Sequence, residues 1–259
     1  MDPHGPYLAR EGFVDAPDAL RDGVAPYGAE WRRRAGDLLA GEGASAATRA
    51  AWSAACDAEV RYLDDELGAL LDDLPALGID GSDLVIVTSD HGEYLGEHDL
   101  VEHSKDVYEE ALRVPMIVRG PGFSPGVDRR PVSVADVYRV ALAAADGARW
   151  DPPDERLIVS ELYWSRKKDL RNPRYGTRFD RIRRAYREGA HKVIVGSDGS
   201  VESYDLTADP READPAPEPW AGALRARGDA WVEATPEAPT VSGRSGDAAA
   251  LRALGYTEE

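Results

Sequence analysis

The sequence predicts an α/β fold in which a layered sheet packs against helices. Three observations lead to this prediction: a helical pattern from Ser45 to Leu74, two short β-branched apolar runs at Leu84–Thr88 and Val114–Val118, and helical spacing again over Val132–Ala145. Helices and strands that alternate with short connections are typical of layered α/β sheets. The 259 residues suffice for one large domain or two small ones, with enough chain to bury a core.

The N-terminal region predicts little regular structure before the first long helix. Residues 8–45 are rich in glycine, alanine, aspartate and arginine with weak periodicity, which indicates loop and short helix. The helix that follows carries apolar side chains at spacings of mostly three and four, at Trp52, Cys56, Val60, Leu63, Leu67, Leu70, Leu71 and Leu74. Pro75 and Gly78 then indicate where this helix ends.

The two apolar runs are predicted to be central strands. Leu84–Thr88 is bounded by turn residues and is typical of a strand buried on both faces, as in a parallel sheet. Val114–Val118 is a second run of this kind, ended by Gly120–Gly122. Between the two runs we expect a short helix over Ser104–Leu112, and a further short strand over Leu157–Ser160.

The composition changes after about residue 165. Arg166–Arg187 is dense in arginine, and the segments His191–Val195 and Val201–Leu206, joined by a glycine-containing turn, predict a hairpin. Four prolines among acidic residues over 208–219 indicate a surface excursion. A helix is expected around Trp220–Val232, followed by a tail rich in glycine, serine and proline.

We therefore expect two parts. Residues 1–165 would form an α/β portion, and residues 166–259 a small α+β subdomain with an irregular tail. The formal net charge of −17, from 48 acidic and 31 basic residues, argues against nucleic acid or an anionic membrane surface as a partner. The single cysteine, Cys56, excludes an internal disulfide framework and a multi-thiolate zinc site; spacing predicts it to be buried and inert. No apolar stretch approaches the ~20 residues of a membrane span. The N-terminus lacks signal-peptide features, so the native compartment is unknown and the chain as it stands is predicted to be cytoplasmic.

The strongest chemical feature follows the first predicted strand. Thr88–Glu93 lies at its carboxyl end, where open α/β sheets bind their ligands. Asp90 and His91 can turn toward one point, and a carboxylate with an imidazole suits a divalent metal. The alternative is that Asp90 caps the next turn and His91 is a surface residue; from the residues alone the two interpretations are equal.

More titratable residues follow in the same segment. His98, His103 and Lys105 come next, so that three of the five histidines fall within thirteen residues, which favours a site. The spacing over His98–His103 does not match either zinc-protease helix motif, so that class is rejected. His4 is fixed between prolines, and composition alone gives it no role. The cluster Arg166–Lys168 could bind an anionic substrate, although a solvated basic turn is the favoured interpretation.

Together these segments resemble the sulfatase family of the alkaline phosphatase superfamily. The matching pieces are Asp2-Pro-His-Gly-Pro-Tyr7, Tyr62-Leu-Asp-Asp-Glu-Leu-Gly68, Leu84-Val-Ile-Val-Thr-Ser-Asp-His-Gly-Glu93, Gly96-Glu-His98, Tyr108-Glu-Glu-Ala-Leu-Arg-Val-Pro-Met-Ile-Val118 and Leu251-Arg-Ala-Leu-Gly-Tyr256. They occur in family order across nearly the whole chain. The resemblance implies an alkaline-phosphatase-like layered α/β/α sheet, here incomplete, with a small C-terminal subdomain of antiparallel β-structure and a helix.

The resemblance also implies roles for single residues. Asp90 and His91 match two metal ligands of the family, usually for calcium. His4 matches a histidine that contacts the sulfate or the leaving-group oxygen. His103 stands where many members carry a sulfate-binding lysine, with Lys105 two residues further on, so His4, His103 and Lys105 are the implied catalytic residues. A protonated His103 could donate to an anionic oxygen, but binding would then depend more on pH.

One family motif does not occur in the 259 residues. Sulfatases attack with a formylglycine made from the cysteine or serine of C/S-x-P-x-R, but Cys56 is followed by Asp-Ala-Glu-Val and no serine begins this pattern. In the family this motif, with an aspartate pair that completes the metal site, precedes the segment that contains His4. We therefore expect that the N-terminal part of a sulfatase-type enzyme is missing and that this polypeptide alone has negligible sulfatase activity.

The leading hypothesis is hydrolysis of a small anionic sulfate ester at a divalent-metal site, with a separately encoded N-terminal half as a potential partner. Hydrolysis of phosphate or phosphonate esters is the alternative within the superfamily, because the same geometry accommodates both tetrahedral anions. A non-catalytic remnant or partner subunit is the alternative from another class. A metal-binding module of unrelated function is disfavoured, since the matches extend far beyond the ligands. No segment indicates the leaving group.

Overall fold

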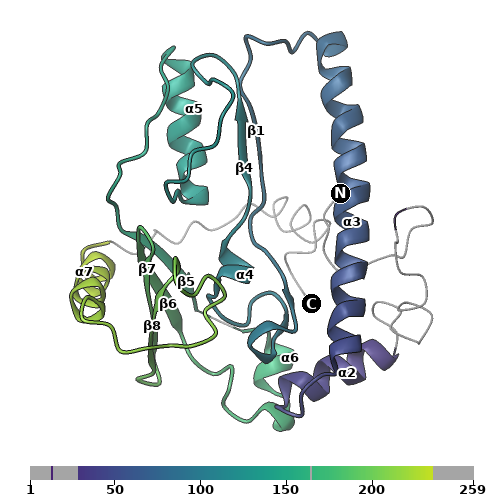
Figure 1. The fold of residues 1–259 in the computed structure, drawn as a ribbon, viewed down its shortest axis with the longest axis vertical. Coiled ribbons are helices and arrows are strands. Elements are labelled where there is room, and N and C mark those ends of the chain that lie inside the picture. Colours follow the sequence, from purple (N-terminus) through teal and green to yellow (C-terminus); the bar gives the residue numbers. More distant parts are fainter. Residues whose placement is uncertain (1–12, 14–28, 164, 236–259) are drawn as a thin grey trace, which may run out of the picture.

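The computed structural model describes residues 13, 29–163 and 165–235, and Figure 1 shows their arrangement. Its helices are α2 (Ala29–Leu39), α3 (Ala46–Asp73), α4 (Glu109–Leu112), α5 (Val137–Ala145), α6 (Lys167–Leu170) and α7 (Ala221–Ala234). Its strands are β1 (Val85–Thr88), β2 (Tyr94–Leu95), β3 (Val101–Glu102), β4 (Met116–Arg119), β5 (Ile158–Leu162), β6 (Arg183–Glu188), β7 (His191–Gly196) and β8 (Val201–Asp205). The α/β class is confirmed. His4 and the segment Leu251–Tyr256 lie outside the described residues.

The long helix predicted from Ser45 to Leu74 is confirmed as α3. Its first turn is capped by the Ser45 side chain, which accepts a hydrogen bond from the Thr48 amide at 3.1 Å. Trp52 is fully buried and packs edge-on against Trp31 of α2, with ring centroids 5.0 Å apart. The buried residues all lie in the N-terminal half, so the C-terminal half of α3 projects along one side of the molecule (Figure 1). Among the described helices, none combines the length and apolar character needed to cross a bilayer.

The first two predicted strands are present, but they do not form a parallel pair. β1 and β4 run antiparallel as a two-stranded ribbon, with Val85 opposite Arg119 and Thr88 opposite Met116. All four residues of β1 are half-buried rather than buried on both faces. The prediction that both runs are buried on both faces, as in a parallel sheet, is therefore wrong for these strands. An apolar, β-branched composition indicates that a strand is packed against other parts of the protein. Whether it runs parallel or antiparallel to its neighbour depends on the segment that connects the two strands.

The connection between β1 and β4 contains too little helix for a parallel crossover. The helix expected over Ser104–Leu112 is confined to α4, a single turn. Glu102 and Ser104 have φ values of 61° and 58°, in the left-handed region, so the helix cannot begin where the sequence pattern predicts it. The chain therefore returns beside β1 in the opposite direction.

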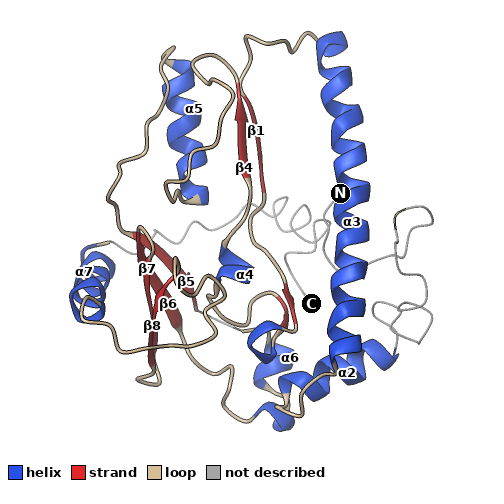
Figure 2. Ribbon diagram, viewed as in Figure 1, coloured by secondary structure: helices blue, strands red, loops and turns tan. Residues whose placement is uncertain are grey.

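A second sheet has four antiparallel strands in the order β5-β6-β7-β8, set apart from the β1–β4 ribbon (Figure 2). The predicted hairpin is confirmed as β7 and β8, and the predicted strand near Leu157–Ser160 as β5. β6 lies in the arginine-rich segment and was not predicted. The division of the chain at residue 165 stays a prediction; β5, which precedes it, pairs with β6, which follows it.

Helix α7, predicted around Trp220–Val232, covers one face of this sheet through contacts with β6 and β7. Its Gly228 lies so close to Tyr186 of β6 that a Cβ atom there would be 2.2 Å from the ring. The Tyr186 hydroxyl also donates to Asp229 Oδ1 at 2.7 Å. Glycine is therefore required at position 228 for the helix to approach the sheet.

Buried ion pairs join the sheet to α4 and to the segment that precedes it. Arg183 of β6 donates through Nε to Asp106 Oδ1 at 2.8 Å, and Lys192 of β7 donates through Nζ to Glu109 Oε1 at 2.9 Å. Lys192 also pairs with Glu212 at 2.8 Å. Glu212 is buried although it lies in the proline-rich excursion over 208–219, most of which is exposed as predicted. These contacts fix the position of α4 relative to the sheet.

Candidate active site

The candidate site is the turn that follows β1. Gly92 lets this turn approach α4, because its amide donates to the Ala111 carbonyl at 2.8 Å and a Cβ atom at Gly92 would be 2.0 Å from the Glu110 carbonyl oxygen. The Thr88 hydroxyl, at the end of β1, donates to the Pro115 carbonyl at 2.8 Å. The turn is thus held on both sides by the segment that leads from α4 into β4.

The turn brings Asp90 and His91 together as a pair of candidate metal ligands. Asp90 Oδ1 accepts from the His91 amide at 3.0 Å, and Asp90 Oδ2 lies 3.8 Å from His91 Nε2. His91 Nδ1 lies 2.9 Å from the Gly92 carbonyl oxygen, which can only accept, so in the neutral ring Nδ1 carries the proton and Nε2 carries the lone pair. A single ion with bonds of about 2.0–2.6 Å can bridge two donors at this separation. The pair therefore fits a divalent metal.

His103 lies against the same pair. Its ring stacks on the His91 ring, with centroids 4.1 Å apart and planes 30° apart. His103 Nδ1 lies 2.7 Å from Glu93 Oε1, and its Nε2 lies 2.7 Å from Arg166 Nη2. A guanidinium only donates, so Nε2 accepts from Arg166 and Nδ1 donates to Glu93. Burial lowers the pKa of His103 despite the opposing influence of Glu93, and the charges on His91 and Arg166 add to that lowering.

His91, Glu93 and His103 also form a group whose ligand atoms all lie within 4.8 Å of one another. Such a group has the composition of a metal site. In this structure, however, both nitrogens of His103 are hydrogen-bonded, one to Glu93 and one to Arg166. An ion bound to His103 would have to displace one of these two partners.

Lys105 is brought to the neighbourhood of the site but is turned away from solvent. Its side chain is 0% exposed and its ammonium is ion-paired with Asp169 of α6. Glu102 lies 3.8 Å from the same ammonium. Burial lowers the pKa of Lys105, and the two carboxylates oppose this effect. In the structure Lys105 therefore holds α6 in place; the catalytic roles assigned to His4, His103 and Lys105 stay predictions.

Two residues of the site were not foreseen from the sequence. The sequence pattern gives Glu93 no role of its own, and it predicts that Arg166 belongs to a solvated basic turn. In the structure Arg166 is 23% exposed and contacts both His103 and Glu102. Its partners are more than sixty positions away, so no local pattern could have indicated them.

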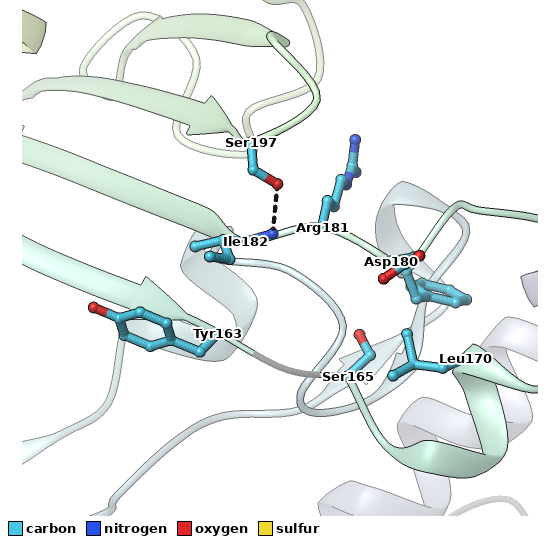
Figure 3. Close-up of a pocket in the computed structure, with 8 residues that line it drawn as sticks. Tyr163, Ser165, Leu170, Asp180, Arg181, Ile182 and Ser197 are labelled. Atoms are coloured by element: carbon cyan, nitrogen blue, oxygen red, sulfur yellow. Dashed lines mark hydrogen bonds between the residues drawn. The ribbon is translucent and has the colours of Figure 1, made fainter.

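Asp90, His91 and His103 open onto a cleft of about 1160 Å³ between the β1–β4 ribbon, α4 and the four-stranded sheet. Arg113, Arg129 and Arg187 also line this cleft. A separate pocket of about 130 Å³ adjoins the segment that carries Arg166, with Ser165 and Leu170 on one side and Ile182 and Ser197 on the other (Figure 3). The large cleft is therefore the one that gives access to Asp90 and His91.

The fold defines the class of protein. The structure is similar to the phosphonate monoester hydrolase SpPMH of Silicibacter pomeroyi, with a TM-score of 0.60 and 20% identity over 90% of this chain and 53% of that one. It is also similar to the phosphonate monoester hydrolase of Agrobacterium radiobacter, with a TM-score of 0.54 and 19% identity over 73% of this chain and 42% of that one. The fold is thus alkaline-phosphatase-like, as the sequence resemblance implied.

The sequence comparisons identify the family within this class. Residues 21–148 match the Sulfatase family model, and this part of the chain belongs to the sulfatase family of the alkaline phosphatase superfamily. Choline-sulfatase of Rhizobium meliloti is 38% identical over 80 residues, which is 31% of this chain and 15% of that protein. The uncharacterized sulfatase YidJ of Escherichia coli is 30% identical over 158 residues, 58% of this chain and 31% of that protein. The chain spans less than a third of the length of these relatives.

Proposed function

We propose that this chain contributes to the hydrolysis of sulfate monoesters at a divalent-metal site whose ligands include Asp90 and His91. The observation that carries the proposal is the 3.8 Å separation of Asp90 Oδ2 and His91 Nε2 at the end of β1, with the His91 tautomer set by Gly92. Membership of the sulfatase family supports the reaction class. Water and the sulfate ester are converted to a free alcohol and sulfate.

The metal would be held by one oxygen of Asp90 and by His91 Nε2, with calcium as the ion expected from the family. A bound divalent ion supplies positive charge that stabilises the developing charge on the sulfuryl oxygens. Neighbouring residues of this chain hold the ligand atom of His91 in the orientation that metal binding requires. The Gly92 carbonyl fixes the orientation of the His91 ring, and the stacked His103 ring, itself held by Glu93, restricts its rotation.

The nucleophile requires a further source. The 259 residues contain no C/S-x-P-x-R motif. We propose that the nucleophile and the remaining metal ligands come from polypeptide outside these 259 residues, with a separately encoded N-terminal half as the partner to be tested. His4 would then contact the sulfate or the leaving-group oxygen. The 259-residue chain by itself is expected to bind the ester but to turn over negligibly little of it.

Calcium binding tests the metal site directly. Isothermal titration of the 259-residue chain with CaCl2 should show one site, and Asp90→Asn and His91→Gln should each weaken it at least about tenfold. Asp72→Asn is the matched control, because Asp72 is an exposed carboxylate at the C-terminal end of α3, outside the turn. Unchanged calcium affinity in the Asp90→Asn variant would refute the assignment.

The ester class is tested separately from the metal. The chain mixed with candidate N-terminal halves is assayed on 4-nitrophenyl sulfate, 4-nitrophenyl phosphate and 4-nitrophenyl phenylphosphonate. Preferential release of 4-nitrophenol from the sulfate supports the proposal. Preference for the phosphate or the phosphonate would overturn the sulfate assignment in favour of the alternative within the superfamily.

A further inference from the structure

We propose that Arg166 supplies the positive charge that recognises the anionic group of the ester, at the position where sequence correspondence places His103. This inference rests on the proposed function and extends it to a residue outside the family motifs. Both ring nitrogens of His103 are already engaged, one with Glu93 and one with Arg166. The second contact brings the guanidinium of Arg166 to the edge of the ring.

Both ring nitrogens of His103 have hydrogen-bond partners. Nδ1 donates to Glu93 Oε1 across 2.7 Å, and Nε2 accepts from Arg166 Nη2 across 2.7 Å. The guanidinium of Arg166 is a permanent cation, and His103 positions it at this edge of the site.

The fold places the Arg166 side chain through contacts on both sides of it. Ser165 Oγ donates to the Ser104 carbonyl at 3.3 Å. Three residues further along, the buried carboxylate of Asp169 is paired with the equally buried Lys105. The segment 165–169 is thus fastened to the segment 102–105 before and after Arg166. A side chain fixed in this way loses less conformational entropy when it binds a ligand.

The carboxylate of Glu102 does not fully neutralise the charge of Arg166. Glu102 lies 3.3 Å from Arg166 Nη1, but the same carboxylate lies 3.6 Å from Lys168 and 3.8 Å from Lys105. One negative charge is therefore shared among three cations. Within the described part of the chain, the contacts of Arg166 to side chains engage one hydrogen on each terminal nitrogen, and a guanidinium carries five N–H donors.

The remaining donors suit a tetrahedral oxyanion. A guanidinium presents parallel N–H groups that match two oxygens of a sulfuryl or phosphoryl group, and such charge-assisted hydrogen bonds are stronger than neutral ones. His103 links the guanidinium to the metal-ligand pair, because its ring stacks on His91 and accepts from Arg166.

The test measures binding of 4-nitrophenyl sulfate by isothermal titration, with the 259-residue chain in saturating CaCl2. Arg166→Gln is expected to weaken binding by about tenfold or more, the usual effect of losing a charge-assisted hydrogen bond. Arg166→Lys, which keeps the charge and loses the fork, should fall between this variant and the parent chain. Lys168→Gln is the matched control: it removes the same charge two residues away, from a side chain that is 54% exposed and also neighbours Glu102. Its effect should stay below about threefold, and matching thermal unfolding curves confirm that the variants fold.

The outcomes separate the two proposals. If the parent chain binds the ester and Arg166→Gln binds it equally well, or no worse than Lys168→Gln, the assignment of Arg166 is wrong while the proposed function stands. If the calcium-loaded parent chain binds neither 4-nitrophenyl sulfate nor 4-nitrophenyl phosphate, the proposed function fails and the role of Arg166 fails with it. Selective loss in Arg166→Gln supports both.

Discussion

Replacing Lys105 by methionine would remove the cation that the buried Asp169 carboxylate contacts. Both side chains are almost completely buried, at 0% and 5% exposure, so solvent screens their interaction little. Glu102 would keep Arg166 at 3.3 Å and Lys168 at 3.6 Å, so the loss falls on Asp169. Breaking one side of a buried pair in this way costs about 3–5 kcal/mol of unfolding free energy, because it leaves an uncompensated buried charge.

The effect is measured by urea unfolding followed by circular dichroism. With a slope of about 1–3 kcal/mol per molar urea, the midpoint of Lys105→Met should fall by roughly 2 M. The double variant Lys105→Met/Asp169→Leu removes both charges and should recover most of the stability. If Lys105→Met is already unfolded in buffer, a folded double variant still tests the anchoring role. A loss below about 1 kcal/mol, or a double variant no more stable than Lys105→Met, would refute the anchoring role.

Three further predictions follow from other contacts. Gly228→Ala should lower the unfolding free energy by about 1–3 kcal/mol, because the new Cβ would overlap the Tyr186 ring. Gly222→Ala, in the same helix, meets nothing within 4 Å and should not destabilise the protein. Thermal unfolding compares the two variants, and equal effects would contradict the packing argument. Burial lowers the pKa of His98, but the Glu110 carboxylate, 3.3 Å away, outweighs it and the pKa is raised. The stabilisation is therefore complete below the unfolded-state pKa of about 6.5 and is lost as pH rises through the higher folded-state value, so His98→Gln should flatten the pH dependence of stability above pH 6, and an unchanged slope would oppose this. Calcium should raise the unfolding temperature of the parent chain but not of Asp90→Asn, and a similar rise in both would place the ion elsewhere.

The sequence was most informative where structure is set by neighbours along the chain. The spacing of apolar residues predicted α3 almost to the residue, because helical hydrogen bonds and the Ser45 cap are local. The proximity of Asp90 and His91 could be predicted for the same reason, since adjacent residues in a tight turn have few ways to separate.

The sequence was least informative where contacts join distant segments. The direction of β4 relative to β1 depends on a connection in which left-handed residues shorten the expected helix, and apolar composition does not record that. Lys105 looks like an exposed cation until Asp169, 64 positions later, is placed beside it. Arg166 looks like part of a basic turn for the same reason. The role of a charged residue depends on whether it is buried, and burial is a property of the whole fold.

The close approach of Gly92 to α4 has a consequence for the time scale on which the turn after β1 opens. The Gly92 amide is bonded to Ala111, and α4 is held to β7 through Glu109 and the buried Lys192. Loop amides usually exchange their hydrogens through small local openings, but here the turn is bonded to α4, and α4 can move only if its buried ion pairs to the sheet yield. The Gly92 amide should therefore be better protected against deuterium exchange than an ordinary loop amide, and any motion that carries the turn together with α4 should occur at a rate set by the four-stranded sheet.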